Sequence, residues 1–160
     1  MSRARSRACA HCVATLDRFA RSEAPDDFVT LVYGVLDTAH GRVRLVNAGH
    51  LPPVIATMDG TALLADDAAS VPLGVPGCRR TEAELHLGPG DALLLFTDGL
   101  VERRDRAIDD GLSALLEALR RTGAHVPLDE SLQSVVTLMT ADGAAEDDVT
   151  ALVIRRGGTR

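Results

Sequence analysis

The spacing of apolar residues changes along the chain from a helical period to the period of β-strands. Apolar residues three to four apart predict a helix from about Cys9 to Arg21. Apolar residues at both odd and even positions of 28–37 then predict a strand covered on both faces. A turn at 39–41 and an alternating run over 42–50 complete a β-hairpin with that strand.

Two further hairpins are predicted downstream by the same alternation. Residues 51–65 contain two short alternating runs around Asp59-Gly60, which we interpret as a two-residue turn. In the segment 81–99, alternating residues lead to a turn at Gly88-Pro89-Gly90. The apolar run after that turn predicts a buried strand that returns and pairs as a third hairpin.

Two amphipathic helices and a final strand complete the pattern. The first helix starts at Asp109 or Asp110 as its N-cap and stops near Gly123, and the second starts at Asp129. A strand follows over 149–155. This order predicts an α+β fold with largely antiparallel sheet. The apolar stripes of the helices comprise Leu112, Leu115, Leu116 and Leu119 in the first, and Leu132, Val135, Val136 and Met139 in the second.

Length and composition narrow the class of protein. The 160 residues fit one domain, which we place at 9–156 between a disordered basic tail, 1–8, and a frayed tail, 157–160. A net charge of -6 and an aromatic content of 2% argue against nucleic acid as a partner. No apolar stretch is long enough to span a membrane, and the basic start lacks the apolar segment of a signal peptide. We therefore expect a cytoplasmic protein without a membrane partner.

The three cysteines do not predict a disulfide framework. Cys9 and Cys12 form a C-x-x-C, and Cys78 is a distant third thiol. A structural zinc site needs four ligands, and no second pair of ligands completes this one. We interpret the motif as small residues at the start of a helix, and we keep a metal or redox role as the less frequent alternative.

Acidic residues occur where two predicted strands end or begin. Asp98 follows the buried strand, and Asp147 and Asp148 precede the last strand. If these strands are antiparallel neighbours, the acids converge at one edge of the sheet, where a cation would keep them ionised. All-oxygen ligands favour Mg²⁺ or Mn²⁺. Spacing alone leaves a commoner alternative open, in which Asp98-Gly99 is only a turn and 147–148 only a solvated loop.

Several ordered motifs resemble one known family. The segments "FVTLVYGVLD", "NAGHLPP", "VPLG", "LGPGDALLLFTDGLVE" and "DDVTALVI" are similar to the stage-II-sporulation-E branch of the PPM-type metal-dependent serine/threonine phosphatases. The resemblance runs from about Cys12 to Arg155. It implies an antiparallel β-sandwich flanked by helices. It also implies hydrolysis of phosphoserine or phosphothreonine on a regulatory protein, such as an anti-sigma-factor antagonist.

The resemblance assigns roles to particular residues. The T-D-G motif places a metal ligand at Asp98, and the D-D-x-T motif places another at Asp147. Gly99 belongs to the same metal site and lets the chain turn beside the ions. Asp148 and Glu102 are candidates for supporting positions around the metals, and so is His50, which we expect to be buried and hydrogen-bonded. The implied cofactors are two Mn²⁺ or Mg²⁺ ions holding the attacking water.

One family motif is missing from the printed sequence. The family pattern begins with G-D-V-x-G-x-G, whose Asp bridges both ions, and the segment "MSRARSR" contains neither Asp nor Gly. We therefore expect an N-terminally truncated domain with a single weak ion at Asp98 and Asp147, and a homodimer through an exposed sheet edge. Three interpretations stay open: an active phosphatase, a catalytically impaired pseudophosphatase that binds a sigma-regulatory partner, and a fragment of a longer protein.

Overall fold

A computed structural model of the chain describes residues 8–24, 26–104, 106–122, 126–141 and 148–157. The chain forms two compact units. Unit 1 comprises 1–52 and 65–86, and unit 2 comprises 53–64 and 87–160. Most of the predicted tails 1–8 and 157–160 lies outside the described residues, so the domain limits remain predictions.

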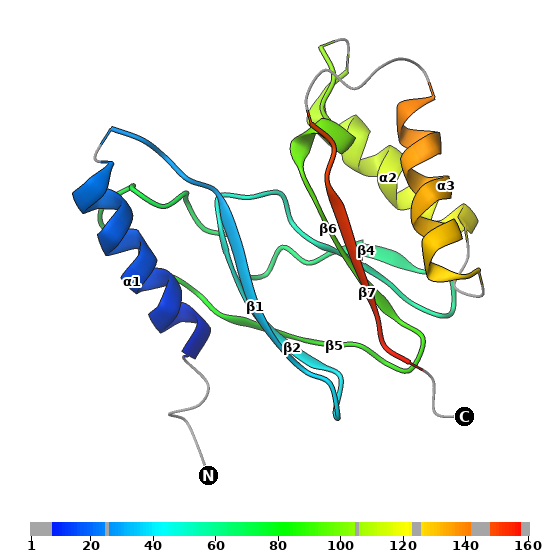
Figure 1. Ribbon diagram of the computed structural model, residues 1–160, viewed down its shortest axis with the longest axis horizontal. Coiled ribbons are helices and arrows are strands. Elements are labelled where there is room, and N and C mark those ends of the chain that lie inside the picture. The colour runs from blue at the N-terminus through cyan, green and yellow to red at the C-terminus, as the bar shows by residue number, and fades with distance from the viewer. Residues whose placement is uncertain (1–7, 25, 105, 123–125, 142–147, 158–160) are drawn as a thin grey trace. The chain divides into compact units, whose positions relative to one another are not determined.

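Unit 1 is a three-stranded antiparallel sheet with one helix packed on it (Figure 1). The strands run in the order β1 (Leu31–Asp37), β2 (Arg42–Ala48) and β5 (Ala83–His86). Helix α1 (Ala8–Glu23) confirms the first predicted helix. The core between helix and sheet consists of small and branched side chains, namely Cys9, Val13, Val46, Ala48 and Leu73.

The outer strand β1 is less covered than its sequence predicts. No residue of β1 is buried, and Gly34 and Val35 are exposed. The prediction of cover on both faces is therefore wrong for β1. Within the described residues β1 is the edge of its sheet and pairs with β2 alone, so it has a neighbouring strand on one side only. Burial is instead concentrated in the central strand β2, where Leu45 and Val46 are buried.

Unit 2 is a four-stranded antiparallel sheet with two helices. Its strands run in the order β4 (Ala62–Leu64), β3 (Val54–Ala56), β6 (Ala92–Phe96) and β7 (Ala151–Arg155). Helix α2 (Ile108–Thr122) contacts β3 and β4, and helix α3 (Leu128–Thr140) contacts β7. A short 3₁₀ helix, η2 (Asp98–Leu100), follows β6 directly. Buried side chains of this core include Val54, Leu94, Phe96, Leu115 and Val135.

The third predicted hairpin is wrong. Strand β5 pairs with β2, whereas β6 pairs with β3 and β7, so the two strands belong to different sheets. The connecting turn is held by other partners: the Gly88 N–H donates to Asp91 Oδ2 at 2.8 Å, and the Gly90 N–H donates to the Arg156 carbonyl at 2.8 Å. Alternation identified both strands correctly but could not reveal their partners, because pairing depends on chain segments far away in sequence.

Turn and cap details also differ from the predictions. The β3–β4 turn spans three residues, 58–60, and Gly60 takes the left-handed conformation with φ of 85°. Asp109 and Asp110 lie inside the first turn of α2, and Asp129 lies inside the first turn of α3, whose N-cap is Pro127. None of the three aspartates is therefore the predicted N-cap. The predicted stop at Gly123 lies outside the described residues.

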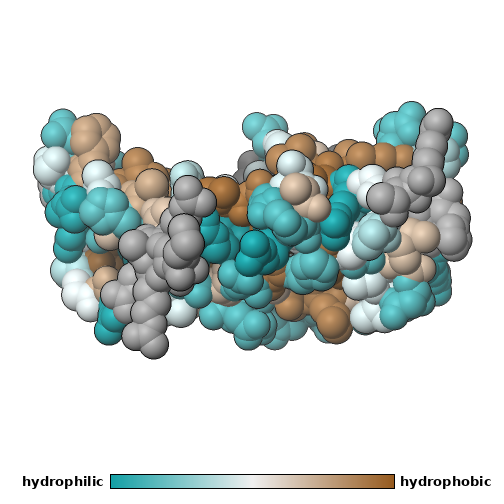
Figure 2. Space-filling view, turned by 90° about the horizontal axis from the view of Figure 1, so that it is seen from below, coloured by the Kyte–Doolittle hydropathy of each residue, from teal (hydrophilic) through white to brown (hydrophobic). Residues whose placement is uncertain are grey.

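The predicted fold class, α+β with antiparallel sheets flanked by helices, is confirmed. None of the helices described by the structure is long and apolar enough to cross a membrane. Hydrophilic and hydrophobic surface are mixed on the face shown in Figure 2. The exposed apolar side chains of unit 1 include Phe19, Phe28 and Val35.

Candidate metal centre at the ends of β6 and β7

The two strands that carry the candidate ligands are antiparallel neighbours. Strands β6 and β7 pair from Ala92 opposite Arg155 to Phe96 opposite Ala151, and they run side by side in Figure 1. The end of β6 therefore lies beside the start of β7. This confirms the strand arrangement on which the predicted convergence of the acids depends.

Thr97 joins the two strand ends directly. Its hydroxyl donates to the Asp148 carbonyl at 2.9 Å and accepts the Thr150 N–H at 2.9 Å. Its own N–H donates to the Thr150 carbonyl at 2.9 Å. The backbone of Asp148 is therefore held next to the residue that precedes Asp98.

Asp98 begins η2 and is exposed. Its Oδ1 accepts the Gly99 N–H at 2.9 Å, and its carbonyl accepts the N–H groups of Val101 and Glu102 at 2.8 and 2.7 Å. Gly99 is buried in η2 and is not among the glycines with positive φ, so the turn does not use the left-handed conformation. The side chain of Glu102 is exposed just beyond η2.

The candidate ligands form an all-oxygen set. Asp148 is exposed at the start of the β7 segment, and Asp147 lies outside the described residues. Within the described part of the chain, no group of three or more His, Cys, Asp or Glu residues lies together. Mg²⁺ and Mn²⁺ bind carboxylate oxygens, and Mg²⁺ in particular keeps several waters, so a site with one or two carboxylates fits such an ion. The exposed carboxylate of Asp98 is a ligand of this kind.

Two helices of unit 2 support the turn that contains Asp98. A Cβ built at Gly111 of α2 would lie 2.1 Å from the Val101 carbonyl oxygen, so the helix packs closely against the residue after η2. The Arg103 guanidinium donates to the carbonyl of Met139 near the end of α3. Helix α3 also contacts η2. The position of Asp98 is thus defined by β7, α2 and α3 together.

His50 lies in unit 1, where the "NAGH" segment forms a compact turn. The Asn47 side chain is buried: its Oδ1 accepts the His50 N–H at 2.9 Å and its Nδ2 donates to the His50 carbonyl at 2.8 Å. Gly49 has φ of 71°, and a Cβ there would lie 2.4 Å from Pro72 Cγ. His50 is half-buried, with Nδ1 3.2 Å from Thr30 Oγ1. The hydrogen bonds explain the motif as a structural turn.

The C-x-x-C motif lies on the first two turns of α1. Cys9 is buried and Cys12 exposed, and the described residues place no third ligand with them. Burial and the nearby Glu82 carboxylate raise the pKa of the Cys9 thiol, which disfavours the thiolate that metal binding requires. The structure thus favours the interpretation of Cys9 as a core residue.

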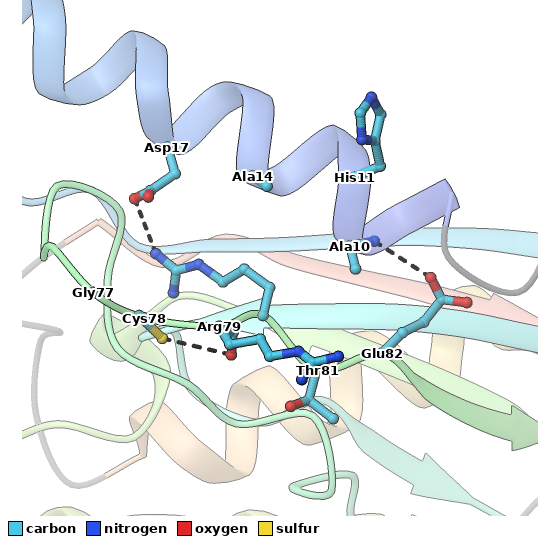
Figure 3. Close-up of a pocket in the computed structure, with 10 residues that line it drawn as sticks. Ala10, His11, Ala14, Asp17, Gly77, Cys78, Arg79, Thr81 and Glu82 are labelled. Carbon is cyan, nitrogen blue, oxygen red and sulfur yellow. Dashed lines mark hydrogen bonds and ion pairs between the residues drawn. The ribbon is translucent and has the colours of Figure 1, made fainter.

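A cavity of about 860 Å³ in unit 1 lies between α1 and residues 77–82. Figure 3 shows Asp17 at one end of this cavity, and Glu82 at the other, where its carboxylate accepts the N–H groups that start α1. None of the site residues predicted from the sequence lines it. The cavity therefore belongs to unit 1, whereas Asp98 and Asp148 belong to unit 2.

Sequence reasoning missed the residues that position the candidate site. Thr97 was interpreted only as part of a motif, although a threonine between an apolar run and Asp-Gly can supply a hydroxyl to a strand end. No sequence pattern indicates the roles of Gly111 and Arg103. Gly111 matters because α2 packs against the Val101 carbonyl, and Arg103 because it donates to the Met139 carbonyl, and both contacts form only in the folded chain.

Comparison with solved structures defines the class of this protein. The chain matches the RsbU and RsbW domains of Rv1364c from Mycobacterium tuberculosis with a TM-score of 0.84 and 28% identity, covering 94% of this chain and 43% of that one. It matches the SiaA-PP2C domain of Pseudomonas aeruginosa with a TM-score of 0.70 and 20% identity, covering 91% and 59% of the two chains. The fold is that of a PP2C-type phosphatase domain.

The family follows from the sequence itself. The family model described as Stage II sporulation protein E (SpoIIE) matches residues 2–157, and the chain belongs to this family. A curated relative, Protein IcfG of Synechocystis sp., is 28% identical over 133 residues, which cover 81% of this chain. The chain spans 21% of the length of that relative and 43% of the Mycobacterium tuberculosis chain. The predicted family is thereby confirmed.

Proposed function

We propose that this chain is a metal-dependent protein serine/threonine phosphatase domain that acts on a phosphorylated regulatory protein. The observation that carries the proposal is the position of Asp98 in a chain of the SpoIIE family. Asp98 is exposed at the end of β6, and the neighbouring Thr97 is hydrogen-bonded to Asp148 at the start of the β7 segment.

The proposed metal ligands are the carboxylates of Asp98 and Asp147, with Gly99 in the same site and with Asp148 and Glu102 as supporting residues. His50 belongs to unit 1, where its hydrogen bonds close the turn at Asn47. Solved relatives support the choice of ion, since one SpoIIE phosphatase structure from Bacillus subtilis was presoaked with Mn and the RsbX structure is a complex with magnesium. A bound Mn²⁺ or Mg²⁺ would lower the pKa of a coordinated water and compensate phosphoryl charge. The exposed Asp98 leaves room for a phosphorylated side chain to approach.

A regulatory protein is the proposed substrate class. In the Mycobacterium tuberculosis relative, an RsbU domain and an RsbW domain occur in one chain, and the PppA relative is described as a key regulatory component. We infer that the substrate is a cytoplasmic protein of the anti-sigma-factor antagonist type that carries phosphoserine or phosphothreonine.

Turnover of p-nitrophenyl phosphate with Mn²⁺ tests the proposal. We expect activity in the chain, activity near background in Asp98→Asn, and unchanged activity in Asp67→Asn. The last variant removes one exposed carboxylate in unit 1 by the same chemical change. Asp98→Asn should keep its thermal stability, because the carboxylate that it replaces is exposed. A large loss of stability in metal-free Asp98→Asn would show that Asp98 is a structural cap.

A chain without Mn²⁺-dependent turnover would support the alternative, a pseudophosphatase that binds its sigma-regulatory partner without hydrolysis. Pull-down of a phosphorylated and an unphosphorylated antagonist protein separates the two functions. Binding without loss of phosphate supports the alternative, and loss of phosphate supports the phosphatase.

The partner proposal also includes a homodimer through the β1 edge. Among the described strands of unit 1, β1 is an outer strand, and it carries the exposed Val35. Unpaired strand edges pair readily with other chains, and a charged side chain on the edge opposes this. Light scattering at tens of micromolar should give a dimer that Val35→Lys converts to monomer. Leu63→Lys, on the outer strand β4 of the other sheet, is the matched control. A monomeric wild-type chain would contradict the homodimer.

A further inference from the structure

We propose that the Thr97 hydroxyl is a positioning group of the candidate metal centre, because it takes the place of the Thr97 carbonyl in the β6–β7 ladder. The carbonyl is thereby released to start η2, which begins at Asp98. The metal-binding part of this inference rests on the proposed function. The replacement of the carbonyl by the hydroxyl as hydrogen-bond acceptor is independent of the proposed function.

The replacement occurs at the last residue pair of the β6–β7 ladder, Thr97 and Thr150. In a hydrogen-bonded antiparallel pair, two opposite residues normally exchange two N–H to carbonyl bonds. Thr97 and Thr150 make the first of these, from the Thr97 N–H to the Thr150 carbonyl at 2.9 Å. In the return bond, the Thr150 N–H donates to Thr97 Oγ1 at 2.9 Å instead of to the Thr97 carbonyl.

The released carbonyl of Thr97 makes the first bond of η2. It accepts the Leu100 N–H at 3.1 Å, which spans the i to i+3 interval of a 3₁₀ turn. Thr97 itself keeps an extended backbone, with φ of -84° and ψ of 160°. One residue is therefore both the last residue of the strand pair and the N-cap of the turn, and Asp98 follows at a fixed place beside β7.

The same hydroxyl also acts as a donor. It donates to the Asp148 carbonyl at 2.9 Å while it accepts the Thr150 N–H. The hydroxyl hydrogen and one oxygen lone pair therefore both bind residues at the start of the neighbouring strand. Asp148 follows Asp147 directly in the sequence. The Thr97 hydroxyl thus connects the segment that contains Asp98 to the segment that begins at Asp148.

Substitutions at Thr97 separate the hydroxyl from the shape of the side chain. Valine keeps the β-branched shape and removes both hydrogen bonds, whereas serine keeps the hydroxyl. Thr57 offers a control hydroxyl at the β3–β4 turn, where it donates to Asp59 Oδ1 at 2.5 Å and lies 3.2 Å from the Thr61 carbonyl oxygen. Thr57→Val therefore removes a comparable hydroxyl elsewhere in unit 2.

The experiment measures amide hydrogen exchange and Mn²⁺ affinity in the full chain. In Thr97→Val we expect faster exchange of the Thr150 amide and Mn²⁺ binding weakened on the order of tenfold, the effect typical of lost supporting bonds around a metal. Thr97→Ser should restore both, and Thr57→Val should leave Mn²⁺ affinity unchanged. If Thr97→Val does not fold, the comparison of Thr97→Ala with Thr97→Ser provides the same test.

The outcomes distinguish this inference from the proposed function. Mn²⁺ binding that is lost in Asp98→Asn but unchanged in Thr97→Val would overturn the positioning role alone. A wild-type chain that binds no Mn²⁺ would overturn the proposed metal centre and, with it, the role of Thr97 there. Weakened binding in Thr97→Val with rescue by serine supports the inference.

Discussion

Arg80 shows how one buried charge organises unit 1. The residue is 8% exposed, and its guanidinium donates to Asp17 Oδ1 at 3.0 Å, Ser70 Oγ at 3.0 Å and the Pro72 carbonyl at 2.9 Å. The Asp17 carboxylate also accepts the Gly74 N–H at 3.0 Å. The Asp17–Arg80 ion pair therefore connects helix α1 to the loop 70–74, which contains the "VPLG" motif.

Arg80→Met should lower the free energy of unfolding by about 3–5 kcal/mol, because it leaves the buried Asp17 carboxylate without its cation. Urea denaturation followed by circular dichroism measures the change. Arg79→Met, at the exposed neighbouring position, should change it by less than about 0.5 kcal/mol. Equal effects of the two variants would show that the buried ion pair does not stabilise the unit.

Asp37 provides a pH-dependent contribution at the β1–β2 turn. The hydrogen bonds from the His40 ring and backbone lower the pKa of the Asp37 carboxyl, and the ring nitrogen is 2.9 Å from Oδ2. Because the pKa is lower in the folded state, the stabilisation is present above the usual range of aspartate. It is lost as the pH falls through the folded-state pKa. In His40→Ala the pKa of Asp37 should rise toward its ordinary value, as read by NMR titration of the carboxyl carbon. An unchanged titration would exclude His40 as the cause.

At the scale of elements, α2 and η2 approach each other too closely for a side chain. Gly111 is buried in the first turns of α2, and Val101, which follows η2, is fully buried. The distance of 2.1 Å between a Cβ at Gly111 and the Val101 carbonyl oxygen is far below any real contact. The helix can take this position only with glycine.

Two opposing effects decide the outcome of Gly111→Ala. Alanine favours a helix over glycine by about 1 kcal/mol, but the clash with backbone forces α2 and η2 apart at a cost of about 1–3 kcal/mol. We expect a net loss of thermal stability and weaker Mn²⁺ binding, because η2 begins at Asp98. Ser113→Ala, at an exposed position of the same helix, should be neutral or stabilising. A stabilised Gly111→Ala would mean that α2 can move away without disturbing the core.

At the scale of the whole molecule, the two units are built from interleaved segments. The β3–β4 hairpin, in 53–64, belongs to unit 2, although unit 1 precedes and follows it in the sequence. Strand β6 pairs with β3 on one side and β7 on the other. A fragment that starts after residue 86 therefore contains β6, β7 and both helices but lacks half of its sheet.

Cutting the chain between residues 86 and 87 tests this organisation. The fragment 87–160 should unfold without a cooperative thermal transition, because Leu94 and Phe96 lose the cover of β3. The fragment 1–86 contains every residue of unit 1 and should retain cooperative unfolding by circular dichroism. Cooperative unfolding of 87–160 alone would show that β3 and β4 add little to the sheet.

Local side-chain pattern accounts for most of the secondary structure. The helical stripe from Cys9, the alternation in 42–50 and the acids beside the strands at Asp98 and Asp148 are all evident in the sequence, because each depends on neighbours a few residues away. Hairpins with short loops, β1–β2 and β3–β4, were predicted for the same reason. The family motifs added the metal-ligand roles of Asp98 and Asp147, which remain proposals.

Long-range partners were decided only by the folded chain. Strand β5 pairs with β2 and not with β6. The buried Arg80 donates to Asp17, to the Ser70 hydroxyl and to the Val71 and Pro72 carbonyls. The Thr97 hydroxyl replaces its own carbonyl because Thr150 lies opposite it. The alternation of apolar and polar residues shows which side of a strand is apolar. Which strand or side chain becomes its partner depends on how whole elements pack and how loops close, and residues distant in the sequence contribute to both.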